Sequence, residues 1–251
     1  MFSWFRALRT ERASYPPAEA GVVLYAVGDI HGRSDCLRRT FDAIDGDAAS
    51  LPQDRAPTEI YLGDFVDRGP DSKGVLDALI ARAGVRNSVF LRGNHEILLE
   101  SFLSGQTPFE AWRMFGGLET ALSYGVDARL LKGDGLKPPD LARLIPAAHL
   151  AFLSALKPYY VSGGYCFVHA GVRPGIPLER QTIEDLAWIR EDFTEARGPF
   201  DHIVVHGHTL TRKVDFGKFR INLDTGAYMT NSLSVIRIDG EGVTELSAAP
   251  A

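Results

Sequence analysis

The chain has 251 residues, which suits one large or two small domains, and its 45% hydrophobic and 24% charged residues are ordinary values for a globular protein. This composition excludes a disordered chain, a collagen and a disulfide scaffold, and no apolar run approaches the roughly 18 residues that a membrane span needs. The 27 basic and 32 acidic residues give a net charge of −5, which argues against a dedicated nucleic-acid binder, and the two cysteines fit a reducing, cytoplasmic setting.

Six short apolar runs bounded by glycine predict β-strands. In chain order they cover residues 22–27, 59–62, 88–91, 165–168, 203–205 and 220–223. Residues 1–20 precede them and predict a flexible N-terminal tail. Residues 21–245 would then form a single domain.

Helical patterns separate the early strands. Apolar side chains recur at helical spacing over 34–44 and over 71–83, where Pro70-Asp71-Ser72 is a helix start signal. Residues 96–156 are mostly helical in pattern, and 183–196 predict a further helix. Parallel units first and antiparallel strands later predict an α/β fold, in which two mixed β-sheets pack as a sandwich with flanking helices.

Polar side chains suited to metal binding come directly after the predicted strands. They are Asp29, His31, Asp64, Asp67, Asn94, His95, His169, His206 and His208. Ligands of α/β proteins gather at the carboxyl ends of strands, so one convergent site is expected. Carboxylate, amide and imidazole groups together hold divalent cations such as Mn, Fe or Zn, and these are too many for one tetrahedral ion. The sequence therefore predicts a dinuclear metal site with Asp64 shared by both ions.

Two arginines stand beside these residues and indicate the substrate. Arg68 and Arg92 each adjoin an expected site residue, and guanidinium groups bind tetrahedral oxyanions with two hydrogen bonds. Two metal ions about 3.5–4 Å apart generate a hydroxide and clamp the oxygens of an in-line phosphoryl displacement. Zinc peptidases and deaminases do not need such arginines, so phosphoryl chemistry is favoured.

The same segments resemble the signature motifs of the phosphoprotein phosphatase family, a branch of the calcineurin-like metallophosphoesterases. The matching motifs are Gly28-Asp-Ile-His-Gly32, Gly63-Asp-Phe-Val-Asp-Arg-Gly69, Arg92-Gly-Asn-His-Glu96, Val168-His-Ala-Gly171 and Gly207-His208-Thr209. Five motifs in the right order, over about residues 22–240, make the resemblance specific. The chain is more similar to bacterial protein phosphatases and diadenosine tetraphosphatases than to eukaryotic enzymes, because it lacks the eukaryotic Ser-Ala-Pro-Asn-Tyr-Cys loop.

The resemblance implies the metallophosphoesterase fold and a role for each site residue. The first metal ion would be held by Asp29, His31 and Asp64, and the second by Asp64, Asn94, His169 and His208. His95 would protonate the leaving oxygen, oriented by Asp67. The phosphoryl oxygens would be held by Arg68, Arg92 and Arg190. A metal-bound hydroxide would attack directly, so no phosphoenzyme is expected.

Other conspicuous residues have simpler interpretations. His206 is expected to pack at its strand end, Asp224 to hold a turn, and Glu96 to start a helix, where the helix dipole favours it. His149 and His202 are expected to be surface or satisfied histidines. The region of about residues 100–164 should shape the substrate face, where its aromatic residues would be core or would line a peptide or nucleotide groove. The side chains in question are Trp112, Arg113, Tyr124 and Tyr159.

Two substrates fit the expected centre, whose ions would be manganese, with iron or zinc as alternatives. The first is phosphoserine or phosphothreonine in proteins, and the second is diadenosine tetraphosphate or another phosphorylated small molecule. A catalytically silent scaffold is disfavoured because none of the expected ligands is missing.

Overall fold

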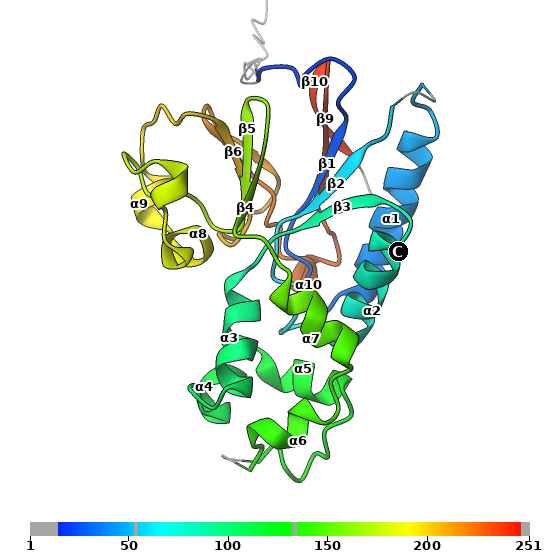
Figure 1. Cartoon of the computed structure of the whole chain (residues 1–251), viewed down its shortest axis with the longest axis vertical. Coiled ribbons are helices and arrows are strands. Elements are labelled where there is room, and N and C mark those ends of the chain that lie inside the picture. The colour runs from blue at the N-terminus through cyan, green and yellow to red at the C-terminus, as the bar shows by residue number, and fades with distance from the viewer. Residues whose placement is uncertain (1–14, 53–54, 133–134, 247–251) are drawn as a thin grey trace, which may run out of the picture.

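The strands of the protein form two sheets of five strands each in the computed structural model, which describes residues 15–52, 55–132 and 135–246 (Figure 1). The first sheet has the order β10-β9-β1-β2-β3, with β1 Leu24–Val27, β2 Thr58–Tyr61, β3 Asn87–Phe90, β9 Val235–Asp239 and β10 Gly242–Leu246. The second has the order β4-β5-β6-β8-β7, with β4 Tyr159–Ser162, β5 Tyr165–Val168, β6 Ile203–His206, β7 Asp215–Phe216 and β8 Arg220–Asn222.

The two sheets pack face to face, as predicted. One face of each strand contributes to a shared apolar core, in which Ala26 and Ile60 of the first sheet join Phe167, Val205 and other residues of the second. Both sheets are mixed. The expectation of antiparallel later strands is met in part: β4, β7, β9 and β10 each pair antiparallel with a neighbour, but β5, β6 and β8 pair in parallel. The connections between the central strands cross over through the α8–α9 region and a long loop, and such connections permit parallel pairing.

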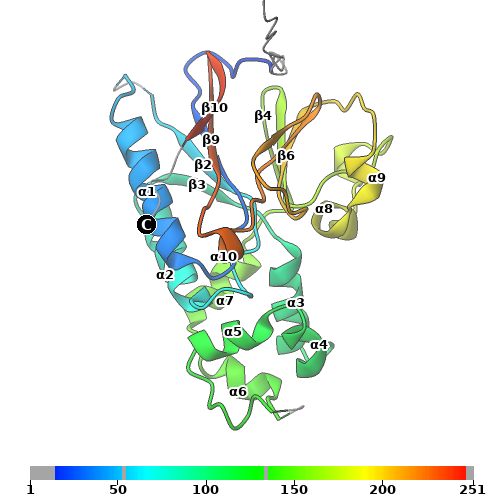
Figure 2. The same cartoon turned by 180° about the vertical axis from the view of Figure 1, so that it is seen from behind.

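Helices cover the outer faces of the sandwich (Figures 1 and 2). α1 (Ser34–Ala48) and α2 (Ser72–Ala83) lie against the first sheet, and α8 (Ile183–Trp188) and α9 (Glu191–Thr194) against the second. The predicted start signal of α2 is confirmed, since the Asp71 carboxylate accepts a hydrogen bond from Gly74 N at 2.9 Å. None of the described helices is both long enough and apolar enough to cross a membrane.

Five short helices form a separate layer at one end of the sandwich, within residues 94–154. They are α3 (Asn94–Leu103), α4 (Phe109–Arg113), α5 (Gly117–Ser123), α6 (Pro138–Ala142) and α7 (Ala147–Ser154). The expected helical region of about 100–164 therefore ends too late. Tyr159–Ser162 is strand β4, whose aromatic and β-branched side chains pair antiparallel with β5.

The expected helix over 183–196 is interrupted. Ile189 is extended at ψ 142° and Arg190 has φ −129°, so α8 and α9 are separate helices. Periodicity does not reveal this break because apolar side chains continue on both sides of it. The break places Arg190 at an exposed corner beside the strand ends.

The structure describes only residues 15–20 of the expected N-terminal tail. Residues 1–14 lie outside the described part of the chain. Residues 15–20 are anchored, because Tyr15 Oη donates to Gly217 O at 2.7 Å, Tyr165 Oη donates to Pro16 O at 2.5 Å, and Ala18 N donates to Asp239 O at 2.9 Å. This segment thus bridges the two sheets.

A buried ion pair between Arg82 and Glu59 joins α2 to the first sheet. Glu59, only 1% exposed, accepts two hydrogen bonds from Arg82 at 2.7 and 2.9 Å, and Arg82 also pairs with Asp45. Arg82→Met would leave the Glu59 charge buried without its partner, so we expect a loss of about 3–5 kcal/mol in the free energy of unfolding, measured by urea denaturation.

The matched control is the more exposed pair of Arg86 with Asp45, at 2.5 Å. Arg86→Met should cost less than about 1 kcal/mol, because exposed ion pairs are screened by water. Equal effects of Arg82→Met and Arg86→Met would contradict the importance given to burial.

Candidate metal centre

Asp64 lies after β2 with its two carboxylate oxygens facing different histidines. Oδ2 is 3.3 Å from Nε2 of His31 and 3.9 Å from Nε2 of His95. Oδ1 is 3.3 Å from Nε2 of His169. The carboxylate therefore joins two buried groups of ligand atoms, each within 4.8 Å of one another: His31, Asp64 and His95, and Asp64, His169 and His208.

The strand ends also bring Asn94 and Asp29 to this cluster. Asn94 Oδ1 is 3.0 Å from Nε2 of His169 and 2.9 Å from Nδ1 of His208. Asp29 Oδ2 accepts a hydrogen bond from the backbone N–H of His208 at 3.0 Å. The six expected metal ligands are thus buried together, at the carboxyl ends of strands of both sheets.

This donor set fits divalent cations. Asp29 Oδ1 and His208 Nε2 are buried without a hydrogen-bond partner among the described residues. Burial, with repulsion from Asp224 and Asp64, raises the pKa of Asp29 well above its usual value, so nearby cations would stabilise its charged form. Burial lowers the pKa of His31 to about 3, which keeps the imidazole neutral and able to donate a lone pair to a metal.

The backbone of the site is strained at several ligands. Among the described non-glycine residues, positive φ occurs at six positions, and five belong to the site: His31 (47°), Asp64 (50°), Asp67 (69°), Arg68 (67°) and His208 (63°). Each costs of order 1–3 kcal/mol unless the surroundings hold it, and such positions cluster at functional sites. The neighbouring glycines permit the close approach. A Cβ on Gly207, for example, would collide with Asp29 Oδ1.

Glu96 does more than start a helix. It stands in the first turn of α3 and accepts from Gly93 N, and its buried carboxylate also accepts from the backbone N–H groups of Asp64 (3.0 Å), Phe65 (2.7 Å) and Val66 (3.3 Å). Burial raises its pKa to about 8. Glu96 therefore fixes the loop that carries Asp64, a role that the sequence pattern did not indicate.

His95 and Asp67 form the expected pair. His95 Nδ1 is 2.8 Å from Asp67 Oδ2, and both side chains are buried. Burial lowers the pKa of His95, but the Asp64 and Asp67 carboxylates outweigh burial and raise it above its usual value. A carboxylate on Nδ1 directs Nε2 toward a reacting group.

The three expected phosphate-binding arginines are placed differently. Arg68 reaches into the cluster, with its guanidinium 3.0 Å from Nε2 of both His31 and His95. Arg92 is half-buried and donates to Glu100 at 2.6 Å and to the carbonyl of Leu153 at 3.0 Å. The structure therefore brings the Arg68 guanidinium to the histidines and ties that of Arg92 to α3 and α7.

Arg190 is exposed and lines a surface depression together with Trp188. Its charge still acts on the cluster. Burial, then the charges of His169 and Arg190, lower the pKa of His208 to about 2. Arg190 is thus within electrostatic reach of the site.

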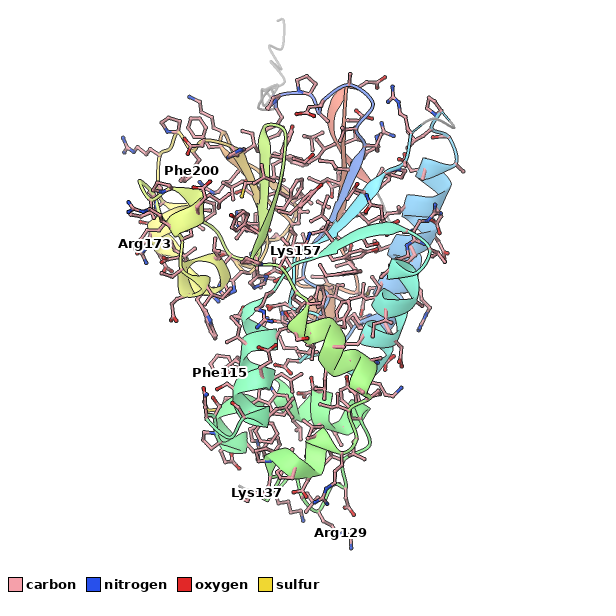
Figure 3. All side chains as sticks on the ribbon, in the orientation of Figure 1. Phe115, Arg129, Lys137, Lys157, Arg173 and Phe200 are labelled. Carbon is pink, nitrogen blue, oxygen red and sulfur yellow. The ribbon has the colours of Figure 1, made fainter. Side chains whose placement is uncertain are left out.

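Three aromatic rings border the histidines, and sequence reasoning gave none of them a role. The ring centroids of Tyr228 and His31 are 5.4 Å apart, and Phe115 and Trp188 lie 6.4 Å from His95 and His208 respectively. Tyr228, Phe115 and Trp188 are here called the aromatic rim. Phe115 is 42% exposed at the edge of the helical layer, below α8 in Figure 3, and its ring is 6.4 Å from that of Trp188.

His206, His149 and Asp224 make local structural contacts. His206 is buried at the end of β6 against Phe193, with ring centroids 5.0 Å apart. His149 is satisfied by Tyr124 Oη at 2.8 Å and Asp77 Oδ1 at 2.9 Å. The Asp224 carboxylate accepts from Gly226 N at 3.0 Å within its turn, and burial raises its pKa to about 6.

Of the four side chains named above for the region of about residues 100–164, Trp112 and Tyr124 belong to the core. Trp112 is fully buried and Tyr124 is 6% exposed. Arg113 pairs with Glu110 at 3.2 Å, and Tyr159 packs in part against the core beneath α8 and α9. Of these four side chains, Trp112 alone contacts an expected catalytic residue, Asp67.

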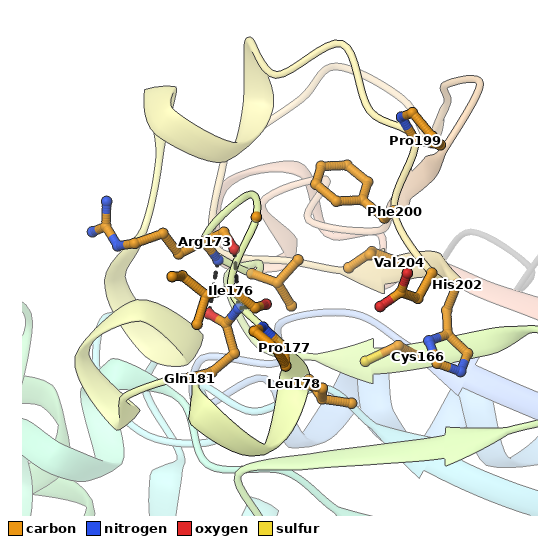
Figure 4. A pocket seen from close by; sticks show the side chains of 13 residues that line it. Cys166, Arg173, Ile176, Pro177, Leu178, Gln181, Pro199, Phe200, His202 and Val204 are labelled. Carbon is orange, nitrogen blue, oxygen red and sulfur yellow. Dashed lines mark hydrogen bonds between the residues drawn. The ribbon is translucent and has the colours of Figure 1, made fainter.

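A separate cavity of about 250 Å³ lies on the outer side of the second sheet (Figure 4). It is lined by Cys166, Ile176, Phe200, His202 and other residues, none of them among the expected site residues. Gln181 on its wall is engaged by Ile176 O and the backbone of Arg173. This cavity is therefore distinct from the metal centre.

Comparisons with known proteins agree with this geometry. Residues 22–224 match the family model of the calcineurin-like phosphoesterases. The asymmetrical bis(5'-nucleosyl)-tetraphosphatase PrpE of Geobacillus thermodenitrificans is 24% identical over 235 residues, covering 84% of this chain and 88% of that protein. A Caenorhabditis elegans protein named "Putative serine/threonine-protein phosphatase C06A1.3" is 36% identical over 173 residues, covering 68% of this chain and 42% of that protein. The crystal structure of a "putative diadenosine tetraphosphatase" superimposes with a TM-score of 0.61 at 23% identity, covering 95% of this chain and all of the other.

Proposed function

The chain belongs to the calcineurin-like phosphoesterase family and is a phosphoester hydrolase, and from this premise we propose that it cleaves dinucleoside polyphosphates such as diadenosine tetraphosphate at the Asp64 centre. The observation that carries this proposal is the aromatic rim around His31, His95 and His208. The protein would act in the cytoplasm, as its cysteine usage suggests.

The proposed metal ligands form two sets that share Asp64. Asp29, His31 and Asp64 would hold one divalent cation, and Asp64, Asn94, His169 and His208 a second. The mixed oxygen and nitrogen donors suit Mn, with Fe or Zn as alternatives. Such ions supply a water nucleophile at neutral pH and neutralise phosphoryl charge.

The chain's own groups act on the phosphate and on the leaving group. Arg68 is close enough to the histidines to bind a phosphoryl oxygen, and Arg92 and Arg190 would extend the positive surface along a polyphosphate. His95 would give a proton from Nε2 to the leaving oxygen while Asp67 holds Nδ1.

The aromatic rim favours a nucleotide over a phosphopeptide. A purine presents a flat π-face, and stacking on an aromatic side chain is worth about 1–3 kcal/mol per base. Phe115 and Trp188 lie next to each other at the rim, while Tyr228 stacks under the Arg68 guanidinium at 5.0 Å. A phosphoserine side chain offers no comparable surface. This reverses the order of the two substrates in the sequence analysis.

Phosphoserine or phosphothreonine in proteins is the second candidate. Its support is the 36% identity with the Caenorhabditis elegans protein named for that activity. The exposed Met114 (84%), next to Phe115, would suit contact with a peptide. Both candidates use the same centre, so they differ only in what the rim binds.

A competition between substrates tests the proposal. We expect manganese-loaded protein to hydrolyse diadenosine tetraphosphate with a kcat/KM at least about tenfold above that for a phosphoserine peptide, because stacking of about 1.4 kcal/mol corresponds to that factor. Trp188→Leu should raise KM for the dinucleotide and leave the peptide reaction nearly unchanged. Turnover of the peptide alone would establish the second candidate instead.

A further inference from the structure

The turn that carries Asp67 and Arg68 is held by the segment between Trp112 and Thr120. Thr120 Oγ1 donates to Asp67 Oδ1 at 2.7 Å, and Trp112 Nε1 donates to Asp67 Oδ2 at 3.0 Å. The same Oδ2 faces His95 Nδ1 at 2.8 Å. The side chains of Asp67, His95, Trp112 and Thr120 are fully buried, so no water competes for these hydrogen bonds.

The hydroxyl of Thr120 has a fixed direction. It accepts from Asp67 N at 2.8 Å and lies 2.9 Å from Ser72 Oγ. An ionised carboxylate only accepts hydrogen bonds, so the single Thr120 proton must point at Asp67 Oδ1. With Trp112 and His95 on Oδ2, each oxygen of Asp67 has its own donors, and the carboxylate cannot rotate without losing them.

The same segment holds the strained backbone. Asp67 and Arg68 are consecutive left-handed residues at φ 69° and 67°, which costs of order 1–3 kcal/mol each when neither is glycine. Arg68 N donates to Gly116 O at 3.1 Å. Gly116 has φ 100°, and a Cβ there would meet the Arg68 backbone. The Trp112–Thr120 segment therefore secures both residues of this turn.

We infer that Trp112 and Thr120 are positioning residues, which orient Asp67 so that Nε2 of His95 faces the leaving oxygen. This rests on the proposed function, in which His95 is the acid. Without these donors the carboxylate of Asp67 is free to turn away from Nδ1, and the His95 ring loses the hydrogen bond that holds Nε2 toward the leaving oxygen. Because Phe115 lies in the same segment, the helical layer couples the substrate face to the proton donor.

The inference predicts a dependence on the leaving group. Esters of poorly acidic alcohols need the proton from His95, whereas dinitrophenyl phosphate releases dinitrophenolate, which departs as a stable anion without a proton. Thr120→Val and Trp112→Phe should therefore lower kcat for an alkyl phosphate about 10- to 100-fold, within the 10²- to 10⁴-fold that a general acid supplies. Hydrolysis of dinitrophenyl phosphate should fall less than about threefold. Thr120→Ser keeps the hydroxyl and should restore the wild-type pattern.

A matched control removes another threonine hydroxyl. Thr107 lies in the α3–α4 loop, where its hydroxyl pairs with Ser101 Oγ at 2.7 Å. Thr107→Val should leave the leaving-group dependence unchanged. An equal fall in kcat for the alkyl and the dinitrophenyl phosphate in Thr120→Val would overturn the inference, and so would a failure of Thr120→Ser to restore the wild-type pattern. Thermal melts establish that each variant is folded.

A second measurement needs neither metal nor turnover. In the metal-free protein, the His95 Nδ1 proton should give a strongly downfield NMR signal, because it is held by a carboxylate. We expect that signal to be lost or shifted upfield in Thr120→Val and kept in Thr107→Val. A signal unchanged by Thr120→Val overturns the inference. Manganese-loaded wild-type protein that does not hydrolyse diadenosine tetraphosphate would instead refute the proposed function, while the NMR result still decides the positioning role.

Discussion

Asp64→Asn is expected to lower kcat/KM by at least about 10³-fold and to reduce the bound divalent metal below two ions per chain. The reason is its place between the two ligand groups, with one oxygen 3.3 Å from His31 and the other 3.3 Å from His169. An amide is neutral and has a single acceptor oxygen. It cannot serve both sides of the site.

The variant should still fold. Asp64 Oδ1 accepts a hydrogen bond from His95 N at 3.1 Å, and the oxygen of an asparagine in the same place can keep it. Metal content by elemental analysis and activity on diadenosine tetraphosphate are measured on the same preparation. Asp215→Asn in the exposed end of β7 is the control, with two ions and normal activity expected. Two bound ions and full activity in Asp64→Asn would rule out a shared carboxylate.

The convergence of this site could be predicted from the sequence, because it depends on chain direction. Asp29, Asp64 and His169 each follow a short apolar strand, and the carboxyl ends of parallel strands meet at one edge. This prediction requires neither the identity of the neighbouring strands nor the register of their pairing. Asn94 and His208 follow β3 and β6 in the same way, so chain direction also predicts their place.

Other features depend on contacts between distant segments, which leave no local pattern. The aromatic rim combines Phe115, Trp188 and Tyr228, whose separation in the chain carries no periodic signal. The bonds of Glu96 to the loop after β2 need a backbone path that a sequence does not display. Arg92 adjoins a ligand in sequence, yet its guanidinium is bound by Glu100. Because Arg92 is close to Asn94 in the sequence, its Cα must lie near the site, but the end of its long side chain can point elsewhere.

The positive φ angles explain why turn chemistry is a weak guide here. Left-handed positions normally indicate glycine or asparagine, but at His31, Asp64 and Arg68 the functional side chain is needed and the strain is held by tertiary contacts. The sequence shows only the glycines around them, such as Gly63 and Gly69.

Asp67→Asn is expected to lower kcat about 10²- to 10⁴-fold and to move the alkaline limb of the pH profile to lower pH. The Asp67 carboxylate, 2.8 Å from Nδ1, acts against burial to raise the pKa of His95 and so favours its protonated form. A general acid works only while protonated, so activity is lost as pH rises through this pKa. Replacing the Asp67 charge by a neutral amide lowers the pKa of His95, and activity is then lost at a lower pH.

The chain offers a matched control in another Asp–His pair. His149 Nε2 lies 2.9 Å from Asp77 Oδ1, between α7 and α2 and outside the metal-ligand cluster. Asp77→Asn should change neither kcat nor the pH profile. Both are measured on an alkyl phosphate, whose alcohol needs a proton from the general acid to leave. A fall in kcat for Asp67→Asn with an unmoved alkaline limb would mean that Asp67 supports the backbone turn alone, and that the limb belongs to another group. If the alkaline limb shifts in Asp67→Asn but not in Asp77→Asn, the Asp67 carboxylate acts through His95. The comparison is matched because each substitution neutralises one aspartate that is bound to a histidine.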